Sequence, residues 1–484
     1  MSAADRLARP VAADAIDRLK RTAGPGNYLD APADIAPYCQ PWRDGWPGKT
    51  PLVLKPRSTA ELAALVKVCA ETRTPIVPLS GNTGLTGASQ PHDDMSEVVI
   101  STERLNKVRE IDLLNDTMTV EAGVILAEIQ RQADAANRFF PLSLGAEGSC
   151  RIGGNISTNA GGIQVLRYGN TRALVLGVEV VLASGEIWNG LRGLRKDNTG
   201  YDLKHLFIGS EGTLGIVTAA VLKLFPKPTA RETALVAVPD PAAGVGLLGH
   251  LRDRLGEAVT SFELIGKPCI DWTVELVEKA PRFEHPLPGN HAWYVLMEIS
   301  GQGAADSLRE PLETALAAAM ETRLVTDALI AQTTAQGRRL WQMREDFSIM
   351  QGKLGTGIKH DVSVPVSKVA EFIERADAAL ARAYPGIRFV TFGHAGDGNI
   401  HYNPVGPADW DGKRFYAERE AVNRIVHDII ADLNGSISAE HGIGRLRMDE
   451  MAHYKSPIEM EMMRTMKRTL DPLNILNPGK VVRV

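Results

Sequence analysis

The segment Pro78–Pro91 reads PLSGNTGLTGASQP and gives the clearest indication of the fold. Its glycines at 81, 84 and 87 follow an apolar run that predicts a buried strand. Glycine tolerates positive φ and lets backbone N–H groups approach a phosphate. The segment is neither a Walker A motif nor a dinucleotide-binding GxGxxG loop. Taken alone, it fits a phosphate-binding loop and a tight surface turn equally well.

The sequence before this segment predicts an α/β unit. LVLKP, ending at Pro56, reads as a short strand, and STAELAALVKVCAET (58–72) repeats apolar residues at helical spacing behind Ser58 or Thr59 as a cap. Strand, helix, strand and glycine loop form the order found in nucleotide-binding units. Further strands are expected in EVVIST (97–102), TMTVEAGV (117–124) and VLGVEVVLASG (175–185).

Two more glycine-rich stretches follow. Residues 142–162 read LSLGAEGSCRIGGNISTNAGG, between flanks that predict regular structure. A backbone wrapped around a large polar ligand fits them better than a disordered linker. Residues 194–218, LRKDNTGYDLKHLFIGSEGTLGIVT, place glycines around Glu211 and Thr213. A bulged hairpin would explain this stretch alone, but the two loops upstream favour a ligand-binding role.

Composition and charge exclude several classes of protein. The chain has 484 residues and a formal net charge of −4, which gives no reason to expect nucleic acid or an anionic membrane as partner. No apolar run is long enough for a transmembrane segment, and Met1–Pro10 lacks the apolar core of a secretion signal. The four cysteines form no CxxC pair, so we expect reduced thiols and a cytoplasmic protein; they are Cys39, Cys69, Cys150 and Cys269.

The prolines of FPKPTA (225–230) mark a domain boundary. We expect four parts: an N-terminal segment 1–50, a ligand-binding domain 51–228, an α+β domain 229–435 and a C-terminal segment 436–484. KRFYAEREAVNRIVHDIIADLNG (413–435) predicts one amphipathic helix closed by Gly435.

Five motifs in order resemble one family. They are PLSGNTGLTG, PLSLGAEGSCRIGGNISTNAGG, RKDNTGYDLKHLFIGSEGTLGI, FGHAGDGNIHYNP (392–404) and GSISAEHGIG (435–444). Together they resemble the vanillyl-alcohol oxidase / p-cresol methylhydroxylase superfamily, in its branch of D-lactate and D-2-hydroxyglutarate dehydrogenases. The similarity runs from about Pro51 to the terminal LDPLNILNPGK. It implies an α+β fold with a two-part FAD-binding domain, a substrate domain with an antiparallel sheet, and a C-terminal segment that returns to the FAD domain.

The resemblance also assigns residues to FAD. The loop Ser80, Gly81, Asn82, Thr83 and Gly84 would hold the pyrophosphate, and Gly212 and Ile216 would pack near the adenine half. Ser149, Gly153, Gly154, Asn155 and Asn159 would line the cofactor, while Asn477 and Lys480 would return to this domain. The first glycine loop has no histidine and no flavin-linking cysteine is evident, so we expect non-covalent FAD.

The histidine motif suggests a metal site. Strand alternation in NIHYN puts His401 and Asn403 on one face, and the glycines before it let His394 fold back beside His401. A pair of histidines seven apart is usually unrelated to metal. The resemblance, however, implies that His394, His401 and Glu440 bind a divalent metal and that His441 is the base. Zinc fits this set, and manganese, iron and cobalt remain open.

RLWQMREDFSIMQ (339–351) predicts a helix with Arg344 and Ser348 on one face. By resemblance these two residues and Lys359 bind substrate, with Ser348 where the family usually has threonine; Asn403 could add a hydrogen bond. Two cations plus a metal predict a dicarboxylate, D-2-hydroxyglutarate first and D-malate second. The alternative is that Arg344 forms a surface pair with Glu345 or Asp346.

Other functions remain open at this point. They are a D-lactate dehydrogenase, a glycolate-oxidase-like subunit, a non-redox FAD enzyme such as an alkyl-glycerone-phosphate synthase, and a metal-dependent hydrolase, which would leave the glycine loops unexplained. No NAD fingerprint is evident, so we expect electrons to leave to an electron-transferring flavoprotein or a quinone. Relatives suggest a homodimer.

Overall fold

The computed structural model describes residues 9–42, 45, 47–279 and 282–484, so most of the predicted signal-free segment Met1–Pro10 lies outside it. The chain separates into two compact units. Unit 1 comprises Met1–Gly161, Gly169–Pro226 and Glu440–Val484, and unit 2 comprises Gly162–Tyr168 and Lys227–Ala439. The sequence placed the corresponding boundaries after residues 228 and 435.

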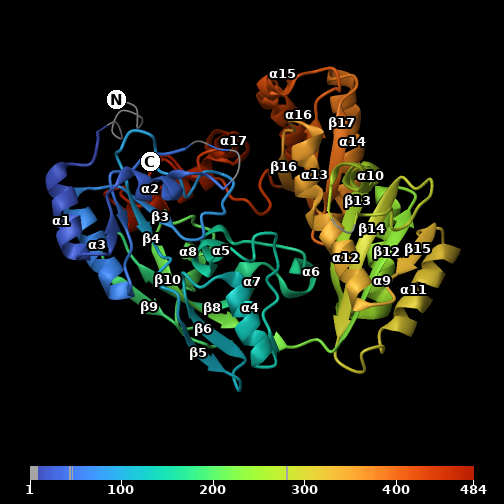
Figure 1. The fold of residues 1–484 in the computed structure, drawn as a ribbon, viewed down its shortest axis with the longest axis horizontal. Helices are drawn as coiled ribbons and strands as arrows, with labels where there is room; N and C mark the ends of the chain where they lie inside the picture. Colours follow the sequence, from blue (N-terminus) through green and yellow to red (C-terminus); the bar gives the residue numbers. More distant parts are fainter. Residues whose placement is uncertain (1–8, 43–44, 46, 280–281) are drawn as a thin grey trace. The chain divides into compact units, whose positions relative to one another are not determined.

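Unit 1 begins with a small sheet in the order β1-β2-β4-β3, of which β3 and β4 are labelled in Figure 1. β2 and β3 run parallel to β4, whereas β1 is antiparallel to β2. Helix α3 packs its buried residues Leu62, Val66 and Cys69 into the core of this sheet, and the Ser58 hydroxyl caps it by accepting the Glu61 amide. The bounds are β1 Tyr28–Leu29, β2 Val53–Leu54, β3 Ile76–Leu79, β4 Val98–Ser101, α1 Ala13–Ala23, α2 Pro32–Cys39 and α3 Thr59–Thr72.

A second, wholly antiparallel sheet follows in the order β5-β6-β10-β8-β9. Together with the first sheet it makes the two-part domain that the resemblance implied. The strands are β5 Val108–Asp112, β6 Thr117–Glu121, β8 Val175–Val181, β9 Ile187–Gly190 and β10 Ile216–Lys223, with the short pair β7 Arg138–Phe139 and β11 Phe225–Pro226. The helices are α4 Leu126–Ala135, α5 Ile152–Thr158, α7 Thr171–Leu174 and α8 Lys204–Phe207. The stretch 142–162 is therefore not all loop, because α5 lies inside it.

The C-terminal segment returns to unit 1, as expected. After α17 (Met448–Tyr454) and α18 (Pro457–Leu470), Leu476 bridges to Ile76 at the edge of the first sheet. The fully buried Lys480 ammonium lies 2.8 Å from the Glu97 carboxylate, which is also fully buried. A buried ion pair of this kind fixes the path of the segment, because either charge left alone would be costly to bury.

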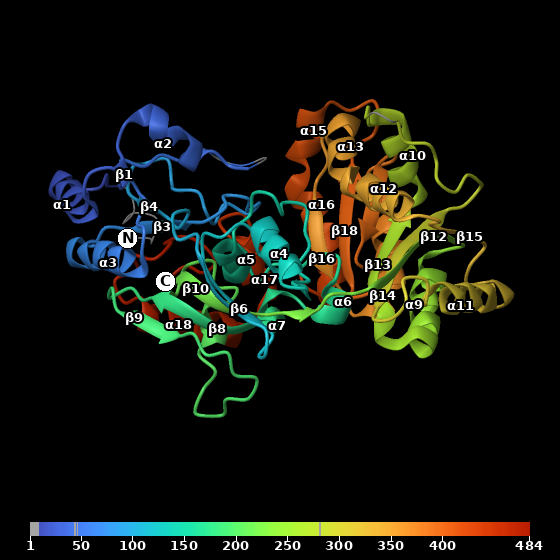
Figure 2. The same cartoon turned by 60° about the horizontal axis from the view of Figure 1, so that its bottom comes forward.

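Unit 2 is built on one seven-stranded sheet in the order β15-β12-β14-β13-β17-β18-β16, whose strands except β17 are labelled in Figure 2. Every neighbouring pair is antiparallel. The strands are β12 Ala230–Val238, β13 Val259–Gly266, β14 Trp293–Gly301, β15 Asp327–Ile330, β16 His360–Ser363, β17 Arg388–Gly393 and β18 Asn399–Val405. The expected α+β domain with an antiparallel sheet is thus confirmed.

Helices cover both faces of this sheet. One face carries the core that includes Ile265 and Phe392, and it packs against α10 (Lys267–Leu276), α12 (Thr334–Glu345) and α13 (Phe347–Leu354). The opposite face packs against α9 (Pro241–Leu255), α14 (Val369–Ala383) and α16 (Arg419–Asp432), with α11 (Arg309–Glu321) against α9. The short α6 (Val165–Tyr168) also belongs to unit 2, where Leu166 lies against Gly396.

Two helix predictions need correction. The stretch 413–435 forms two helices, α15 (Gly412–Ala417) and α16, because the chain turns tightly at Glu418. Its left-handed terminal residue is Asn434, with φ 57°, rather than Gly435. Gly435 instead permits close packing, since a Cβ there would lie 2.3 Å from the Ser363 carbonyl oxygen. Residues 339–351 likewise divide at Asp346, which ends α12 and begins α13, so Arg344 and Ser348 lie on different helices.

Candidate active site

The three glycine-rich stretches of unit 1 meet one another. A Cβ on Gly81 would lie 2.8 Å from the Arg151 amide nitrogen and 2.9 Å from the Ser149 carbonyl oxygen, so the first and second stretches touch through backbone. A Cβ on Gly154 would lie 3.4 Å from that of Ser80. Gly212, with φ 73°, packs the third stretch on Pro78 at 3.0 Å. Larger side chains at these positions would force the loops apart.

The polar residues of these loops divide into two groups. The Asn82 amide shapes its own loop, donating to the Gln40 carbonyl and accepting from Ser89 and Gln90, and Asn159 accepts the Arg172 amide at the end of α5. The side-chain oxygens of Asn155 and Asn477, by contrast, are buried with no partner among the described residues. Buried acceptors of this kind require a donor. The loops therefore fit a large polar ligand such as FAD.

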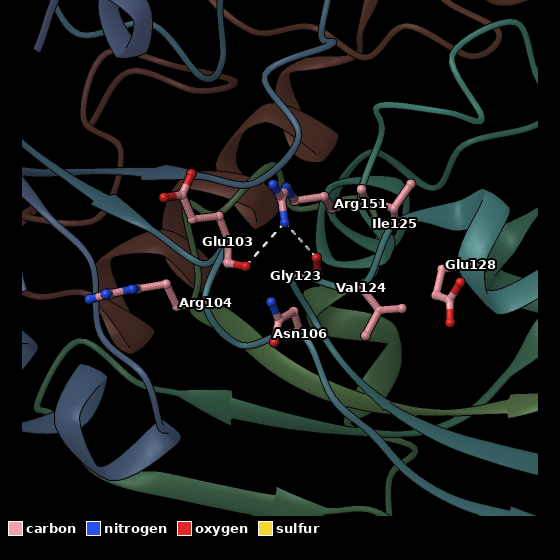
Figure 3. A pocket seen from close by; sticks show the side chains of 8 residues that line it. All are labelled: Glu103, Arg104, Asn106, Gly123, Val124, Ile125, Glu128 and Arg151. Carbon is pink, nitrogen blue, oxygen red and sulfur yellow. Dashed lines mark hydrogen bonds between the residues drawn. The ribbon is translucent and has the colours of Figure 1, made fainter. Parts of the chain in front are cut away.

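A pocket of about 520 Å³ lies on unit 1, and its lining includes none of the residues expected to bind FAD. Figure 3 shows the Arg151 guanidinium between the carbonyl oxygens of Glu103 and Gly123, at 3.1 and 2.7 Å. Arg151 thus ties together the segments that follow β4 and β6. Its backbone is the one that Gly81 touches, so this side chain holds the second glycine stretch in place.

Strand register gathers the candidate catalytic residues of unit 2 on one face. His401 on β18 is paired with Asp361 on the neighbouring strand β16 and with Phe392 on the other neighbouring strand, β17. Directly paired residues point to the same face, and side chains alternate along each strand. The pairs His360↔Tyr402 and Gly357↔Val405 bracket Lys359 and so place it opposite Asn403. The face that carries His401 therefore also carries Asn403, Asp361 and Lys359.

The predicted metal ligands are brought together. One ligand atom from each of His394, His401 and Glu440 lies within 4.8 Å of the others. The imidazole rings are 5.6 Å apart, because the turn after β17 brings His394 back beside β18. Glu440 directly follows Ala439, whose amide donates to the Asp361 carbonyl, so chain connection alone keeps Glu440 near these histidines. Two nitrogens and a carboxylate form a donor set that fits zinc and similar divalent ions.

The carboxylate of Asp361 belongs to a second group of possible metal ligands. Asp361, Glu440 and His441 form another group whose ligand atoms lie within 4.8 Å of one another. Asp361 is 1 % exposed, and its Oδ1 accepts the Asn399 side-chain amide and lies 4.0 Å from His401 Nδ1. Sequence reasoning missed Asp361, although it lies only two residues after Lys359, a predicted substrate residue.

Glu263 is the other residue that sequence reasoning missed. It is fully buried on β13, where its carboxylate accepts hydrogen bonds from Arg344 Nε at 2.7 Å and from His394 Nδ1. Burial alone would raise the pKa of Glu263, but the Arg344 guanidinium and His394 outweigh it and lower the pKa to about 2. The available signal was a lone acid within VTSFELIG, a strand whose other residues are mostly apolar.

The predicted substrate residues have distinct surroundings. Arg344 pairs with Glu263, so the alternative surface pair with Glu345 or Asp346 is wrong; Asp346 pairs with Lys279 instead. The Ser348 hydroxyl donates to the Glu345 carbonyl. Asn403 accepts the His360 amide and donates to Gln351 on α13, whereas the Lys359 side chain is exposed.

In unit 1, the segment that carries His441 is held by two contacts. The Thr86 hydroxyl, just beyond the first glycine loop, donates to the His441 carbonyl at 3.2 Å. The buried Glu211 carboxylate accepts the amides of Ile443 and Gly444 at 2.7 and 2.9 Å. Burial raises the pKa of Glu211 to about 7 despite these two bonds. Both contacts fix His441 relative to the candidate cofactor loops, because all of these residues belong to unit 1.

Comparison with known proteins agrees with this architecture. Residues 50–190 match the model of an FAD binding domain, and residues 227–481 match that of the C-terminal domain of FAD linked oxidases. p-Cresol methylhydroxylase shares the fold with a TM-score of 0.75 at 18% identity, over 97% of this chain and 96% of that one. An alkyldihydroxyacetonephosphate synthase does so with a TM-score of 0.72 at 17% identity, over 97% and 87%. At such low identity these two likenesses show the fold alone.

Sequence relatives narrow the class. D-2-hydroxyglutarate dehydrogenase of Stutzerimonas stutzeri is 34% identical, over 96% of this chain and 98% of its own length. The mitochondrial D-2-hydroxyglutarate dehydrogenases of Bos taurus and Arabidopsis thaliana are 36% and 35% identical, over 98% and 96% of this chain and 84% and 81% of theirs. The chain therefore belongs to the FAD-linked oxidases, in the branch of the D-2-hydroxy acid dehydrogenases. No helix in the described part of the chain is long and apolar enough to cross a membrane.

Proposed function

We propose that the protein oxidises a D-2-hydroxy dicarboxylate to the 2-oxo acid, with D-2-hydroxyglutarate preferred and D-malate second. The observation that carries the proposal is the group of His394, His401 and Glu440, whose ligand atoms lie within 4.8 Å of one another. Three relatives that span most of the chain bear the name D-2-hydroxyglutarate dehydrogenase, which supports the choice of substrate.

The residues divide the chemistry between them. His394, His401 and Glu440 would hold a divalent ion, zinc by preference, which lowers the pKa of a bound hydroxyl group. His441, next to Glu440 in the chain, takes the hydroxyl proton as general base. FAD held by unit 1 would supply the two-electron acceptor, with flavin N5 as the expected position for the hydride. We propose that FAD is held without a covalent bond by the residues of the three glycine stretches.

Two cations support a second carboxylate on the substrate. Arg344 has its Nε bound to Glu263, and its η nitrogens have no hydrogen-bond acceptor in the described part of the chain. A guanidinium can present two such nitrogens to one carboxylate. Lys359 lies opposite Asn403 and adds a point charge. Ser348 and Asn403 would complete the hydrogen bonds to the substrate.

One observation favours a second candidate, a D-lactate dehydrogenase. The Glu263 carboxylate neutralises Arg344, so the site is less cationic than the two positive side chains alone suggest. A site with one effective cation would suit a monocarboxylate. If D-lactate gives a higher kcat/KM than D-2-hydroxyglutarate, the dicarboxylate proposal fails.

The decisive experiment is anaerobic reduction of the flavin by D- and L-2-hydroxy acids, before and after treatment with a chelator. We expect D-acids alone to bleach the flavin absorbance and the chelator to abolish this. Bleaching that survives complete metal removal would refute the metal assignment. Absence of bleaching by every hydroxy acid would instead favour a non-redox FAD enzyme.

The proposal also covers the electron acceptor, the oligomeric state and the cellular compartment of the protein. Electrons would leave to an electron-transferring flavoprotein or a quinone, and the protein would act as a homodimer in the cytoplasm. The four cysteines are unpaired and buried, which fits a reducing compartment. Turnover with each acceptor and light scattering of the holoprotein test the first two points.

A further inference from the structure

We propose that Glu263 is a positioning residue that sets metal retention and substrate affinity together. One carboxylate, buried in the sheet of unit 2, binds a candidate metal ligand through one oxygen and the candidate substrate arginine through the other. The inference rests on the proposed function, because it assigns Glu263 a part in the same site.

Glu263 holds the imidazole ring of His394 at its Nδ1 atom. Glu263 Oε1 lies against His394 Nδ1, and this carboxylate is fully buried. An ionised carboxylate accepts only, so Nδ1 must carry the proton and Nε2 keeps its lone pair. Nε2 is then the nitrogen left for an ion shared with His401 and Glu440. Carboxylates placed behind metal-binding histidines orient the ring in this way.

Glu263 also holds the guanidinium of Arg344. Glu263 Oε2 accepts from Nε at 2.7 Å, and the guanidinium carbon lies 4.7 Å from the centre of the Phe392 ring. These two contacts fix both the position and the plane of the guanidinium, which leaves the η nitrogens for a substrate carboxylate. The Phe392 ring also lies 5.1 Å from the His401 ring, so the aromatic support for Arg344 is continuous with the metal group.

The contacts with His394 and Arg344 are made by one side chain, that of Glu263. A shift of Glu263 must displace His394 and Arg344 at once, because each oxygen has its own partner. A purely structural ion pair would change stability without changing metal affinity or substrate affinity. Glu298 provides the matched control: it is buried on the neighbouring strand β14, opposite Ser261, and pairs with Arg231 at 3.1 Å.

The experiment compares Glu263→Gln and Glu298→Gln in the FAD-loaded protein. Zinc is titrated against a fluorescent chelator, cobalt substitution is followed by its visible spectrum, and kcat and KM are measured with D-2-hydroxyglutarate at saturating zinc. For Glu263→Gln we expect zinc affinity to fall about 10-fold to 100-fold, an altered cobalt spectrum, a KM raised about tenfold, and a smaller change in kcat. FAD content should be unchanged. Glu298→Gln should leave all of these values as in the wild type.

The outcomes separate this inference from the proposed function. Wild-type zinc affinity and KM in Glu263→Gln would overturn the inference while leaving the proposed function intact. A wild-type protein that binds neither zinc nor cobalt would overturn both. If Glu263→Gln does not fold, Glu263→Asp replaces it, since the shorter side chain keeps the charge but cannot reach both partners. Zinc affinity and KM should then still change together, and a change in only one would contradict the inference.

Discussion

The candidate cofactor site of unit 1 and the candidate catalytic face of unit 2 are built in different ways. In unit 1 the loops touch through backbone, at Gly81, Gly154 and Gly212, and several polar side chains serve the loops themselves. In unit 2 the site is made of side chains on paired strands, with buried carboxylates behind the histidines. A backbone-built site should be sensitive to side-chain volume, and a side-chain-built site should be sensitive to charge and hydrogen bonding.

The largest expected effect is the loss of kcat when a proposed catalytic side chain, that of His441, is removed. His441→Ala should lower kcat about 1,000-fold, because it removes the proposed general base. FAD content should stay at the wild-type value, because the Thr86 contact is with the His441 backbone carbonyl and does not need the ring. Zinc affinity should stay as well, because the substitution leaves His394, His401 and Glu440 in place. Stopped-flow flavin reduction measures this loss. His453→Ala, an exposed histidine on α17, is the control and should have no effect. Retained reduction in His441→Ala would remove His441 from the chemistry.

Side-chain volume should matter most in unit 1. Gly81→Val should weaken FAD binding about 100-fold, because its Cβ would lie 2.8 Å from the Arg151 amide nitrogen and force the two loops apart. Zinc binding should persist, because the two histidine ligands, His394 and His401, belong to unit 2. Flavin fluorescence on titration into the apoprotein gives the affinity. Gly249→Ala, where a Cβ meets nothing within 4 Å, should bind FAD normally. Normal FAD binding by Gly81→Val would contradict a cofactor site that depends on close backbone contact between the loops.

Glu211 is a side chain of unit 1 that binds backbone amides, those of Ile443 and Gly444, and its effect on stability can be tested. Its folded-state pKa of about 7 exceeds the ordinary value of 4.5, so the folded protein holds a proton that the unfolded chain has lost. The free energy of unfolding should therefore fall, on the order of 2 kcal/mol, as pH rises from about 4.5 to 7. Glu211→Gln should remove that part of the slope. Urea unfolding at pH 5 and pH 7.5 measures it, and equal slopes in both proteins would contradict the assignment.

The smallest expected effect concerns Lys359 and its proposed contact with the second carboxylate of the substrate. Lys359→Ala should raise KM for D-2-hydroxyglutarate about tenfold and leave KM for D-lactate unchanged, because an exposed point charge contributes modestly and only to the second carboxylate. Lys353→Ala, an exposed lysine on α13, is the matched control. Equal effects on both substrates would mean that Lys359 contacts no distal carboxylate.

Features of the fold and of the candidate site could be predicted from the sequence where they depend on residues close together in the chain. The glycine stretches and the strand–helix–strand start of unit 1 follow from local residue preferences. The placement of His401 and Asn403 on the same face of β18 follows from strand alternation. Glu263 and Asp361 could not be placed, because their roles depend on which strands are neighbours, and β13, β16 and β18 are far apart in sequence. The breaks at Asp346 and Glu418 were missed because apolar periodicity continues across them.

The return of the C-terminal segment has a consequence for synthesis of the chain. Unit 2 is almost continuous in sequence, from Lys227 to Ala439, and can collapse while translation proceeds. Unit 1 cannot, because Ile76 receives its bridge from Leu476 and Glu97 its cation from Lys480. Its first sheet must therefore wait until residue 480 has left the ribosome, because until then Glu97 lacks the Lys480 ammonium and one sheet edge is uncovered. A nascent chain stalled before that point should be open to proteases in its N-terminal third and resistant across unit 2.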